Sequence, residues 1–541
     1  MTVNRTRWLA QTAIVLAVTG CGMTVTGGSA ADEPLTGTSL EQASAAALKH
    51  VGGGTVLETE AGDEGTAYVV EILRNDGSTV EVQLDEAFKV IGDSADDDEQ
   101  GETEEQEDED KGEDDGDKKT EGRLDGMIPQ PEVGDLKVAP MSQRVDLAVP
   151  TFSNPTNVTN PWFPVSRQES VLLLGEVDGQ PFRTEVTLLP DTRIIKWQGQ
   201  LVETLISQYV AYLGGRIHEV AYDHYAQADD GSVWYFGEDV LNFKDGAIVD
   251  THGTWFAGKD GPAAMIMPAK PKVGDVHRSE NIPGLVFEEV TVKDVNQTLD
   301  GPIGLIKGGL LVEELHMIEN NVEQKIFAPG YGEFFTGGDG DVEALALAVP
   351  TDRETGAEPA ALATLRQGAA SVFNAAKAGD WPTAVTSADA MSITWQAYRA
   401  GLVPKLIEPR MTAAIEALIA AVSEEDPKAA RQAAIDTAQW TLDLTLRYRR
   451  SVEIDLARFD LWAAQLLLDA GASDPAAMNG DFFTLDLIRD RIAHALNDAD
   501  RARVNLQLEE LLSAVGDEDF KAAAETAEEL RAIVADLQIA G

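Results

Sequence analysis

The chain has 541 residues, 43% of them hydrophobic, which is enough for about three folded domains. Its net charge of −51 excludes a nucleic-acid-binding protein, which needs a basic surface, and argues against electrostatic docking on anionic lipid headgroups. Because Cys21 is the only cysteine, an intrachain disulfide is excluded as well.

The N-terminal segment is typical of an exported, membrane-anchored protein. Two arginines precede a mostly apolar run over 8–19, which suits a signal peptide and is too short to span a membrane. The following Val18-Thr19-Gly20-Cys21 resembles a bacterial lipobox. This resemblance implies a signal peptide over 1–20, a lipid anchor with palmitate-type chains on Cys21, and a tether over 21–36.

Lipidation would place the protein on the extracytoplasmic face of a cell membrane, as a lipoprotein of the cell envelope. The alternative is ordinary cleavage near Ser29-Ala30-Ala31, which would release a secreted protein. Elsewhere the sequence has no run of about 18 apolar residues that would predict a membrane-spanning helix, so the lipid is the expected membrane contact.

Residues 37–92 are predicted to form a small α+β domain. Apolar residues at helical spacing from Leu40 to Val51 predict a helix, which a run of three glycines ends. Strands are expected over 68–73 and 80–84, joined by a hairpin turn at Asn75-Asp76-Gly77.

This order of elements resembles the PepSY domain, which occurs in propeptides of secreted peptidases and in envelope proteins. The matching residues are Ala46, Ala47, Gly53-Gly54, Val56, Tyr68, Val70, Asp76-Gly77, Val82 and Asp85. The resemblance implies a binding or peptidase-inhibiting module that carries no catalytic residue. A small accessory domain without activity is the alternative.

Residues 93–140 are predicted to be a disordered acidic linker. The stretch 93–119 has 16 Asp or Glu, 3 Lys and almost no apolar residue, so it cannot bury enough surface to offset the entropy of folding. Charge repulsion would keep it extended. We interpret it as a spacer, with weak capture of cations or cationic peptides as the alternative.

Residues 141–350 are predicted to form an all-β domain, either a sandwich or a barrel. Short β-branched and aromatic runs alternate with turn signals such as Asp178-Gly179, Asp230-Gly231 and Asp245-Gly246. The stretch 222–239 is expected to be a hairpin that turns at Asp230-Gly231.

The same region resembles an uncharacterised β-rich domain of exported bacterial proteins, although His224 stands where that pattern commonly has tryptophan. The matching segments are 222–239, 253–255, 265–268, 271–275 and 328–332. This resemblance implies a fold and a location but no activity.

Five acidic residues of the 222–239 hairpin are candidate Ca²⁺ ligands, because Ca²⁺ prefers carboxylate oxygens. They are Asp223, Asp229, Asp230, Glu238 and Asp239. The spacing of an EF-hand loop is missing, and turn-forming, solvated aspartates are the interpretation that we favour. His218 and His224 are six residues apart and could share a strand face, but they lack the spacing of His-Glu-x-x-His, so no metal ligand is assigned.

Residues 355–541 are predicted to be all-α. Four aspartates follow short breaks and precede helical runs, at separations of 46, 48 and 45 residues, and each has Ala or Met four residues later. Aspartate at this position is typical of a helix N-cap. The capping residues are Asp380, Asp426, Asp474 and Asp519, and the apolar positions are Ala384, Ala430, Met478 and Ala523. The repeat predicts helical hairpins, arranged as a bundle or a short solenoid.

A single long, charged helix is expected over 429–470. Asp443 and Arg447 are one turn apart in it and could pair. A candidate binding cluster for an anion or another ligand consists of Arg447, Arg450 and Arg458. A helix face covered with salt bridges is the alternative, and we favour it.

The sequence contains no nucleophile elbow, P-loop, dinucleotide fingerprint or His-Glu-x-x-His motif, and its single Glu-x-x-His pair, Glu313 with His316, lies in the β-rich region rather than in the helices. We therefore expect a non-enzymatic envelope lipoprotein that binds a peptide, a protein partner or a small ligand.

No cofactor is predicted, and Ca²⁺ is the one candidate. An extracellular hydrolase centred on the β-rich domain is the first alternative, because catalytic residues assembled from distant positions leave no local motif. Divalent-cation binding or buffering by the acidic surface is the second.

Overall fold

The computed structural model describes residues 46–47, 49–51, 55–61, 67–73, 79–85, 88–95, 138–318, 320–338, 341–537 and 539. The expected signal peptide, Cys21, the tether and most of the acidic linker lie outside these residues. The chain divides into two compact units, Met1–Glu121 and Gly122–Gly541. Within the described ranges, no helix is both long enough and apolar enough to cross a membrane.

The first unit contains a four-stranded antiparallel sheet with the strand order β1-β2-β3-β4. Its strands are β1 (Thr55–Ala61), β2 (Tyr68–Leu73), β3 (Thr79–Leu84) and β4 (Val90–Ala95). Ala47, Val70 and Val82 are buried together, and Tyr68 stacks on Phe88 at a ring-centroid distance of 4.8 Å. The two strands expected from the sequence lie at β2 and β3, and β1 and β4 extend the sheet on either side.

One antiparallel sheet of 14 strands makes up the β-rich part of the second unit. Its strands are β5 (Ser170–Val177), β6 (Gln180–Trp197), β7 (Gln200–Leu213), β8 (Arg216–Gln227), β9 (Val233–Lys244), β10 (Ala247–Asp250), β11 (Trp255–Phe256), β12 (Ala264–Met267), β13 (Val276–Ile282), β14 (Val286–Asp300), β15 (Leu305–His316), β16 (Asn321–Ala328), β17 (Gly332–Gly338) and β18 (Asp341–Val349). The strand order is β10-β9-β8-β7-β6-β5-β18-β17-β16-β15-β14-β13, and β11 and β12 both pair with β9.

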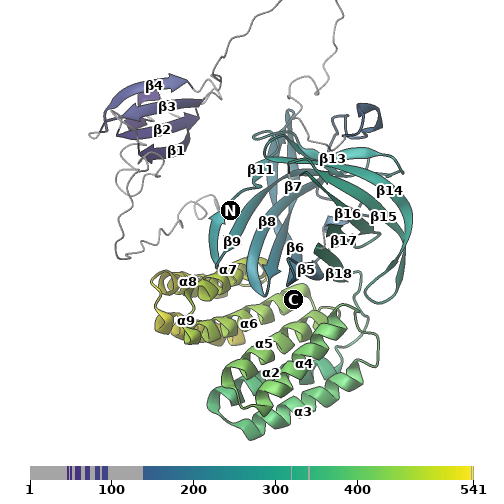
Figure 1. Ribbon diagram of the computed structural model, residues 1–541, viewed down its shortest axis with the longest axis vertical. Helices are drawn as coiled ribbons and strands as arrows, with labels where there is room; N and C mark the ends of the chain where they lie inside the picture. The colour runs from purple at the N-terminus through teal and green to yellow at the C-terminus, as the bar shows by residue number, and fades with distance from the viewer. Residues whose placement is uncertain are drawn as a thin grey trace, which may run out of the picture. The chain divides into compact units, whose positions relative to one another are not determined.

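This sheet curls around its own interior face (Figure 1). Val233 of β9, Val290 of β14 and Phe327 of β16 pack in one apolar cluster, although their strands are far apart in the strand order. Register shifts of the kind that β-bulges produce occur between β6 and β7 and between β14 and β15, and such bulges bend a sheet. The β-rich region is therefore one curled sheet rather than the two packed sheets of a sandwich.

The hairpin turns predicted in the β-rich region lie where the sequence indicates them, whereas the turn predicted at Asn75-Asp76-Gly77 lies outside the described residues. Asp178-Gly179 joins β5 to β6 and Asp245-Gly246 joins β9 to β10, and these four residues have φ values of 52°, 71°, 51° and 75°. Two consecutive residues with positive φ make the tight turn that matches the twist of antiparallel strands. The hairpin of β8 and β9 turns at Asp230-Gly231, so the expectation for 222–239 is confirmed.

The region after the sheet is helical, as the sequence predicts. Its described helices are α2 (Ala360–Ala378), α3 (Trp381–Tyr398), α4 (Ile407–Ser423), α5 (Pro427–Thr445), α6 (Ser451–Ala472), α7 (Pro475–Ile492), α8 (Asp498–Gly516) and α9 (Phe520–Asp536). Consecutive helices pack as the pairs α2–α3, α4–α5, α6–α7 and α8–α9. The period of about 46 residues in the sequence is therefore the length of one helical hairpin.

The four predicted N-caps are confirmed. The side chain of each aspartate accepts a hydrogen bond from a backbone N–H in the first turn of α3, α5, α7 or α9. These aspartates are Asp380, Asp426, Asp474 and Asp519. The apolar residue four positions after each cap is 0% exposed, so the repeat marks the core position of the second helix in every hairpin.

The expected single helix over 429–470 is wrong, because residues 446–450 separate α5 from α6. The side chain of Arg447 is 1% exposed in this break and donates hydrogen bonds to the backbone oxygens of Asp352 and Leu402. These partners come from distant parts of the chain. The break is therefore fixed by tertiary contacts, and no proline or glycine marks it in the sequence.

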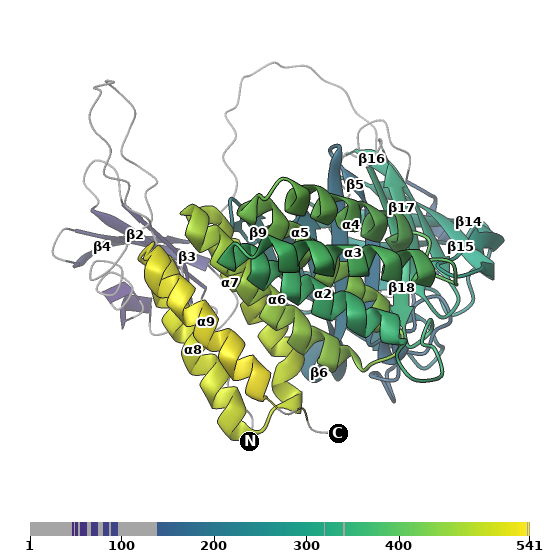
Figure 2. The ribbon, with the colours of Figure 1, turned by 90° about the horizontal axis from the view of Figure 1, so that it is seen from below.

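The helices lie against the outer face of the curled sheet (Figure 1, Figure 2). Leu172 of β5 and Leu347 of β18 pack with α2, and Tyr212 of β7 stacks on Trp462 of α6 at a centroid distance of 5.6 Å. Polar contacts join the same surfaces, since Tyr222 of β8 donates a hydrogen bond to a carboxylate of α7. The sheet and the helices thus form one unit. The interior face of the sheet, which the helices do not cover, encloses a cavity.

Candidate functional site

The interior of the curled sheet contains a cavity of about 120 Å³. It is lined by Phe163, Val165, Gln168, Val171, Leu173, Val186, Leu188, Ser207, Tyr209, Asp223, Tyr225, Tyr331, Gly332, Glu333 and Glu343. Three of these residues are carboxylic acids and three are tyrosines, and none of the described lining residues is a lysine, an arginine or a histidine. Acidic and aromatic side chains therefore share one small space.

Strand register places the polar lining residues on the interior face. Side chains alternate between the two faces of a strand, and residues directly opposite each other on antiparallel neighbours share a face. Ser207 of β7 lies opposite Asp223 of β8, which lies opposite Glu238 of β9. These three side chains therefore belong to the interior, whereas the neighbouring Tyr222 faces the helices.

A β-bulge in β9 brings Tyr235 and Glu238 onto the same face, although they are three residues apart. They lie opposite Tyr225 and Asp223 of β8, so β9 has one extra residue in this interval. Gly237 occupies the bulge with a φ of +116°, and a Cβ there would lie 2.0 Å from a backbone oxygen of β11. Glycine is required at this position. The bulge allows the Tyr235 hydroxyl to donate a 2.7 Å hydrogen bond to Asp223 Oδ1.

Burial changes the acid–base behaviour of the cavity. Burial, reinforced by the charge of Glu333, raises the pKa of Glu343 to about 7. Burial also raises the pKa of Asp223 to about 7, against the opposing hydrogen bond from Tyr235. Glu343 Oε1 is shielded from solvent and has no hydrogen-bond partner among the residues that the structure describes. The ionised forms of both acids are therefore unfavourable unless a cation compensates them.

A second group of ionisable residues, the β14–β16 cluster, consists of Glu288, Glu314, His316, Glu323 and Lys325. His316 Nδ1 lies 2.7 Å from Glu288 Oε1, and His316 Nε2 lies 3.4 Å from Glu323 Oε2. Lys325 Nζ lies 2.5 Å from Glu314 Oε2. Burial lowers the pKa of His316, but the carboxylates of Glu288 and Glu323 outweigh it and raise that pKa to about 10.

The structure brings together only two of the five candidate Ca²⁺ ligands. Asp223 and Glu238 are opposite each other in the interior. Asp229 accepts hydrogen bonds from Thr151 and Ser153 in the segment before β5, and Asp230 accepts them from Ser232 within the β8–β9 turn. Asp239 pairs with an arginine at an N–O distance of 3.0 Å on the opposite face. The five residues thus do not converge on one ion, and Asp229 and Asp230 are turn residues, as the favoured interpretation holds.

The two histidines of β8 are also in different environments. His218 is exposed, and His224 is buried with Nδ1 3.4 Å from Thr204 Oγ1. The ring of His224 lies 5.4 Å from that of Phe256. Burial, together with the charge of Arg193, lowers the pKa of His224 to about 3, so this residue is a neutral histidine packed on an aromatic ring.

The arginine cluster expected in the helices is divided among three places. Arg447 is buried and pairs with Glu354, rather than with Asp443 as expected. Arg450, which directly precedes α6, pairs with Glu453 in the first turn of that helix at 2.8 Å. Arg458 is buried under the sheet, where its Nη2 lies 2.7 Å from Asp443 Oδ1. The three arginines therefore serve separate salt bridges and do not line one anion site. They do not share one helix face either, because Arg447 lies in the break between α5 and α6.

Sequence reasoning missed the acids that matter most in the interior, Glu343 and Glu314. In an antiparallel sheet with one solvated face, a charged strand residue ordinarily faces solvent. The sequence does contain one indication, because Glu314 and His316 are two residues apart and therefore share a face of β15. Glu313 points to the other face, where it pairs with Lys293 at 2.8 Å. The Glu-x-x-His pair noted in the sequence is thus split between the two faces of the sheet.

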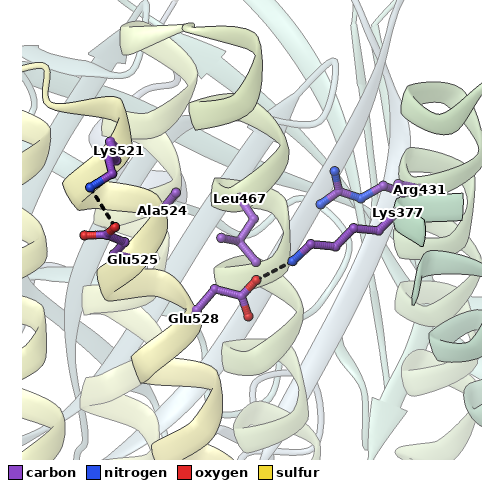
Figure 3. A pocket seen from close by; sticks show the side chains of 7 residues that line it. All are labelled: Lys377, Arg431, Leu467, Lys521, Ala524, Glu525 and Glu528. Atoms are coloured by element: carbon purple, nitrogen blue, oxygen red, sulfur yellow. Dashed lines mark hydrogen bonds and ion pairs between the residues drawn. The ribbon is translucent and has the colours of Figure 1, made fainter. Parts of the chain in front are cut away.

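The helices carry a larger but open hollow of about 300 Å³ on the surface (Figure 3). Lys377 of α2 and Glu528 of α9 approach to 2.6 Å in it, and Lys521 pairs with Glu525 at 3.0 Å. Arg431 of α5 also borders the hollow, and its guanidinium lies 4.5 Å from the centre of a phenylalanine ring. Because the lysines are already neutralised by glutamates, this hollow is a weaker candidate than the interior cavity.

No protein-family model matches the sequence, and no curated protein shows significant similarity to it.

Proposed function

We propose that this chain is an extracytoplasmic binding protein that holds a small organic ammonium ion in the cavity of the curled sheet. The observation that carries the proposal is the cavity lining, in which three carboxylic acids and three tyrosines surround about 120 Å³. A binding role also agrees with the lack of any complete catalytic motif in the sequence.

An organic ammonium ion matches both parts of this lining. Its charge would compensate Asp223 and Glu343, whose ionised forms are made unfavourable by burial. Its alkyl groups would rest on the tyrosine rings, whose faces attract cations. The ligand would be small, because pockets for drug-sized molecules have volumes of roughly 300–1,000 Å³.

The other parts of the chain fit this role through the sequence alone. A lipid on Cys21 would hold the protein on the extracytoplasmic face of a cell membrane. The acidic linker over 93–140 would set how far from the membrane the cavity can extend. The PepSY-like module over 37–92 would offer a separate binding surface for a peptide or protein partner. The resemblance of 141–350 to a β-rich domain of exported proteins supports the same location.

Calorimetric titration of the mature, full-length protein tests the proposal. The ligands are small primary, tertiary and quaternary ammonium ions, choline among them, each compared with an uncharged isostere of the same shape. We expect at least one ammonium ion to bind about tenfold or more tightly than its isostere, which corresponds to about 1.4 kcal/mol. If no ammonium ion binds, or if the isosteres bind equally well, the proposal is wrong.

Matched variants locate the binding. Glu343→Gln removes one interior charge and is expected to weaken ammonium binding about tenfold or more. Glu416→Gln removes one charge from the exposed face of α4 and is expected to change nothing. Equal effects of the two substitutions would indicate general attraction by the acidic protein rather than binding in the cavity.

An extracellular hydrolase is the second candidate, and one observation favours it. Asp223 and Glu238 lie opposite each other on the neighbouring strands β8 and β9. A pKa of about 7 for Asp223 suits a general acid. Turnover of a small ester or glycoside that is lost in Asp223→Asn, and kept in Asp229→Asn, would replace the binding proposal with this one.

A further inference from the structure

We propose that the β14–β16 cluster binds one divalent transition-metal ion of the zinc class, with Glu314, His316 and Glu323 as ligands. Glu288 would orient the histidine. This inference goes beyond the ammonium proposal and does not depend on it, because none of these residues lines the interior cavity.

Strand register brings the three ligands to one place. His316 of β15 lies opposite Glu288 of β14, and Glu314 of β15 lies opposite Glu323 of β16. Opposite residues share a face, and residues two apart on a strand share it too. One ligand atom from each of Glu314, His316 and Glu323 lies within 4.8 Å of the other two. The three ligand atoms therefore converge from two neighbouring strands.

The orientation of His316 is the observation that points to a metal rather than to a plain cluster of acids. Glu288 engages Nδ1 at 2.7 Å, which turns Nε2 toward Glu314 and Glu323. Nε2 is shielded from solvent, and its nearest carboxylate oxygen, Glu323 Oε2, lies 3.4 Å away without hydrogen-bonding geometry. A carboxylate on one ring nitrogen, with the second nitrogen turned toward further carboxylates, is the arrangement that metal-binding histidines usually have.

The distances are close to those of a tetrahedral zinc site. Two ligand atoms at 2.0–2.1 Å from a tetrahedral ion are about 3.3–3.4 Å apart. His316 Nε2 is 3.4 Å from Glu323 Oε2 and 4.0 Å from Glu314 Oε2. The first pair already has the required separation, and a small side-chain rotation would bring in Glu314. Three protein ligands leave the fourth position of the ion for water.

The charges balance for a divalent ion. Glu288, Glu314 and Glu323 contribute three negative charges, and Lys325 contributes one positive charge beside Glu314. A neutral, metal-bound His316 leaves a net charge of about −2, which one divalent cation neutralises. A histidine nitrogen among the ligands favours Zn²⁺ and its neighbours over Ca²⁺ and Mg²⁺, which prefer oxygen.

Lys325 is a built-in competitor for the ion. Its ammonium group lies 2.5 Å from Glu314 Oε2, the same oxygen that faces the proposed metal position. A metal ion and an ammonium group repel each other at this distance. We therefore expect Lys325→Met to bind zinc more tightly than the wild type does.

Zinc titration of the full-length mature protein, after removal of metals by a chelator, tests the proposal. A large excess of Ca²⁺ is present throughout, so that the oxygen ligands of the acidic linker are occupied. We expect one Zn²⁺ per chain. Co²⁺ in place of Zn²⁺ should give the visible absorption of a tetrahedral ion with a nitrogen ligand, a readout that oxygen-only surface sites do not produce.

Variants assign the ligands. His316→Ala and Glu323→Gln should each weaken zinc binding about 100-fold and abolish the Co²⁺ spectrum, and Glu288→Gln should weaken binding by about 10–100-fold. His218→Ala, which removes an exposed histidine of β8, is the control and should bind like the wild type. If His316→Ala does not fold, the zinc affinity of Glu323→Gln tests the proposal instead. The Glu323 side chain is 30% exposed and outside the core, so we expect this variant to fold.

Three results would overturn the proposal. The wild type could fail to bind zinc in excess Ca²⁺, or His316→Ala and Glu323→Gln could bind as tightly as the wild type. Weaker binding by Lys325→Met would contradict the placement of the ion beside Glu314.

Discussion

Arg491 and Glu185 are 306 residues apart in the chain, yet Nη1 of the arginine on α7 donates to Oε2 of the glutamate on β6 at 2.7 Å. Their side chains are 1% and 5% exposed. Burial opposes ionisation of Glu185, but Arg458, Arg183 and Arg491 together hold its pKa far below the ordinary value. The sheet and the helices therefore share one buried charge network.

Arg491→Met is expected to lower the free energy of unfolding by about 3–5 kcal/mol, because it removes a partner of a buried carboxylate. Urea unfolding monitored by circular dichroism measures the loss. Arg489→Met is the control, since Arg489 pairs with a partly exposed Asp486 on its own helix and should cost less than about 1 kcal/mol. Similar losses for the two variants would show that the buried network stabilises the fold no more than an exposed ion pair does.

The stability of the protein is expected to fall as the pH rises from about 4.5 to about 7, and Glu343 contributes to this fall. Its pKa is 4.5 in the unfolded chain and about 7 in the folded protein, so the folded state binds the proton more tightly in this window. Deprotonation at higher pH removes the contribution of Glu343 to the free energy of unfolding, which is on the order of 3 kcal/mol. This contribution is fully lost above the pKa of the folded protein.

Glu343→Gln should therefore flatten the pH dependence of the free energy of unfolding, while Glu416→Gln on the surface of α4 should leave its slope unchanged. Urea titrations at about pH 5 and about pH 8 compare the three proteins. A slope for Glu343→Gln equal to that of the wild type would contradict a raised pKa for Glu343.

Gly237→Ala is expected to disturb the interior from the bulge of β9. A Cβ at this position would lie 2.0 Å from a backbone oxygen, and a φ of +116° is strained for alanine. We expect a loss of about 1–3 kcal/mol or more, together with weaker ammonium binding, because the bulge sets the positions of Tyr235 and Glu238.

Gly471→Ala in α6 is the matched control. A Cβ there meets nothing within 4 Å, and alanine is the better helix former by up to about 1 kcal/mol. Thermal unfolding of both variants checks the prediction, which fails if Gly237→Ala melts at the wild-type temperature.

Cys21→Ser is expected to release the protein from the membrane fraction. Mass spectrometry of the mature N-terminus should find a diacylated cysteine in the wild type and none in the variant. An unmodified wild-type protein that starts near Ala31 would instead mean that the chain is secreted, and the search for its ligand would then move to the surrounding medium.

The sequence by itself determined those features that depend on neighbouring residues. An aspartate such as Asp426 caps a helix by bonding to backbone N–H groups two and three residues away, so its position alone predicted where α5 begins. Asp178-Gly179 predicted the turn between β5 and β6 in the same way, because the two residues adopt the required positive φ values locally.

Only the tertiary structure decided the features that depend on distant partners. Arg447 ends α5 through bonds to Asp352 and Leu402, which no local pattern records. Glu343 and Glu314 look like solvent-facing strand residues in the sequence. Because the sheet curls and turns their face inward, Glu343 instead lines the cavity and Glu314 is buried. A charge inside a fold is compensated by groups that the chain brings from elsewhere, so the candidate site emerged only when register and curvature had placed those groups together.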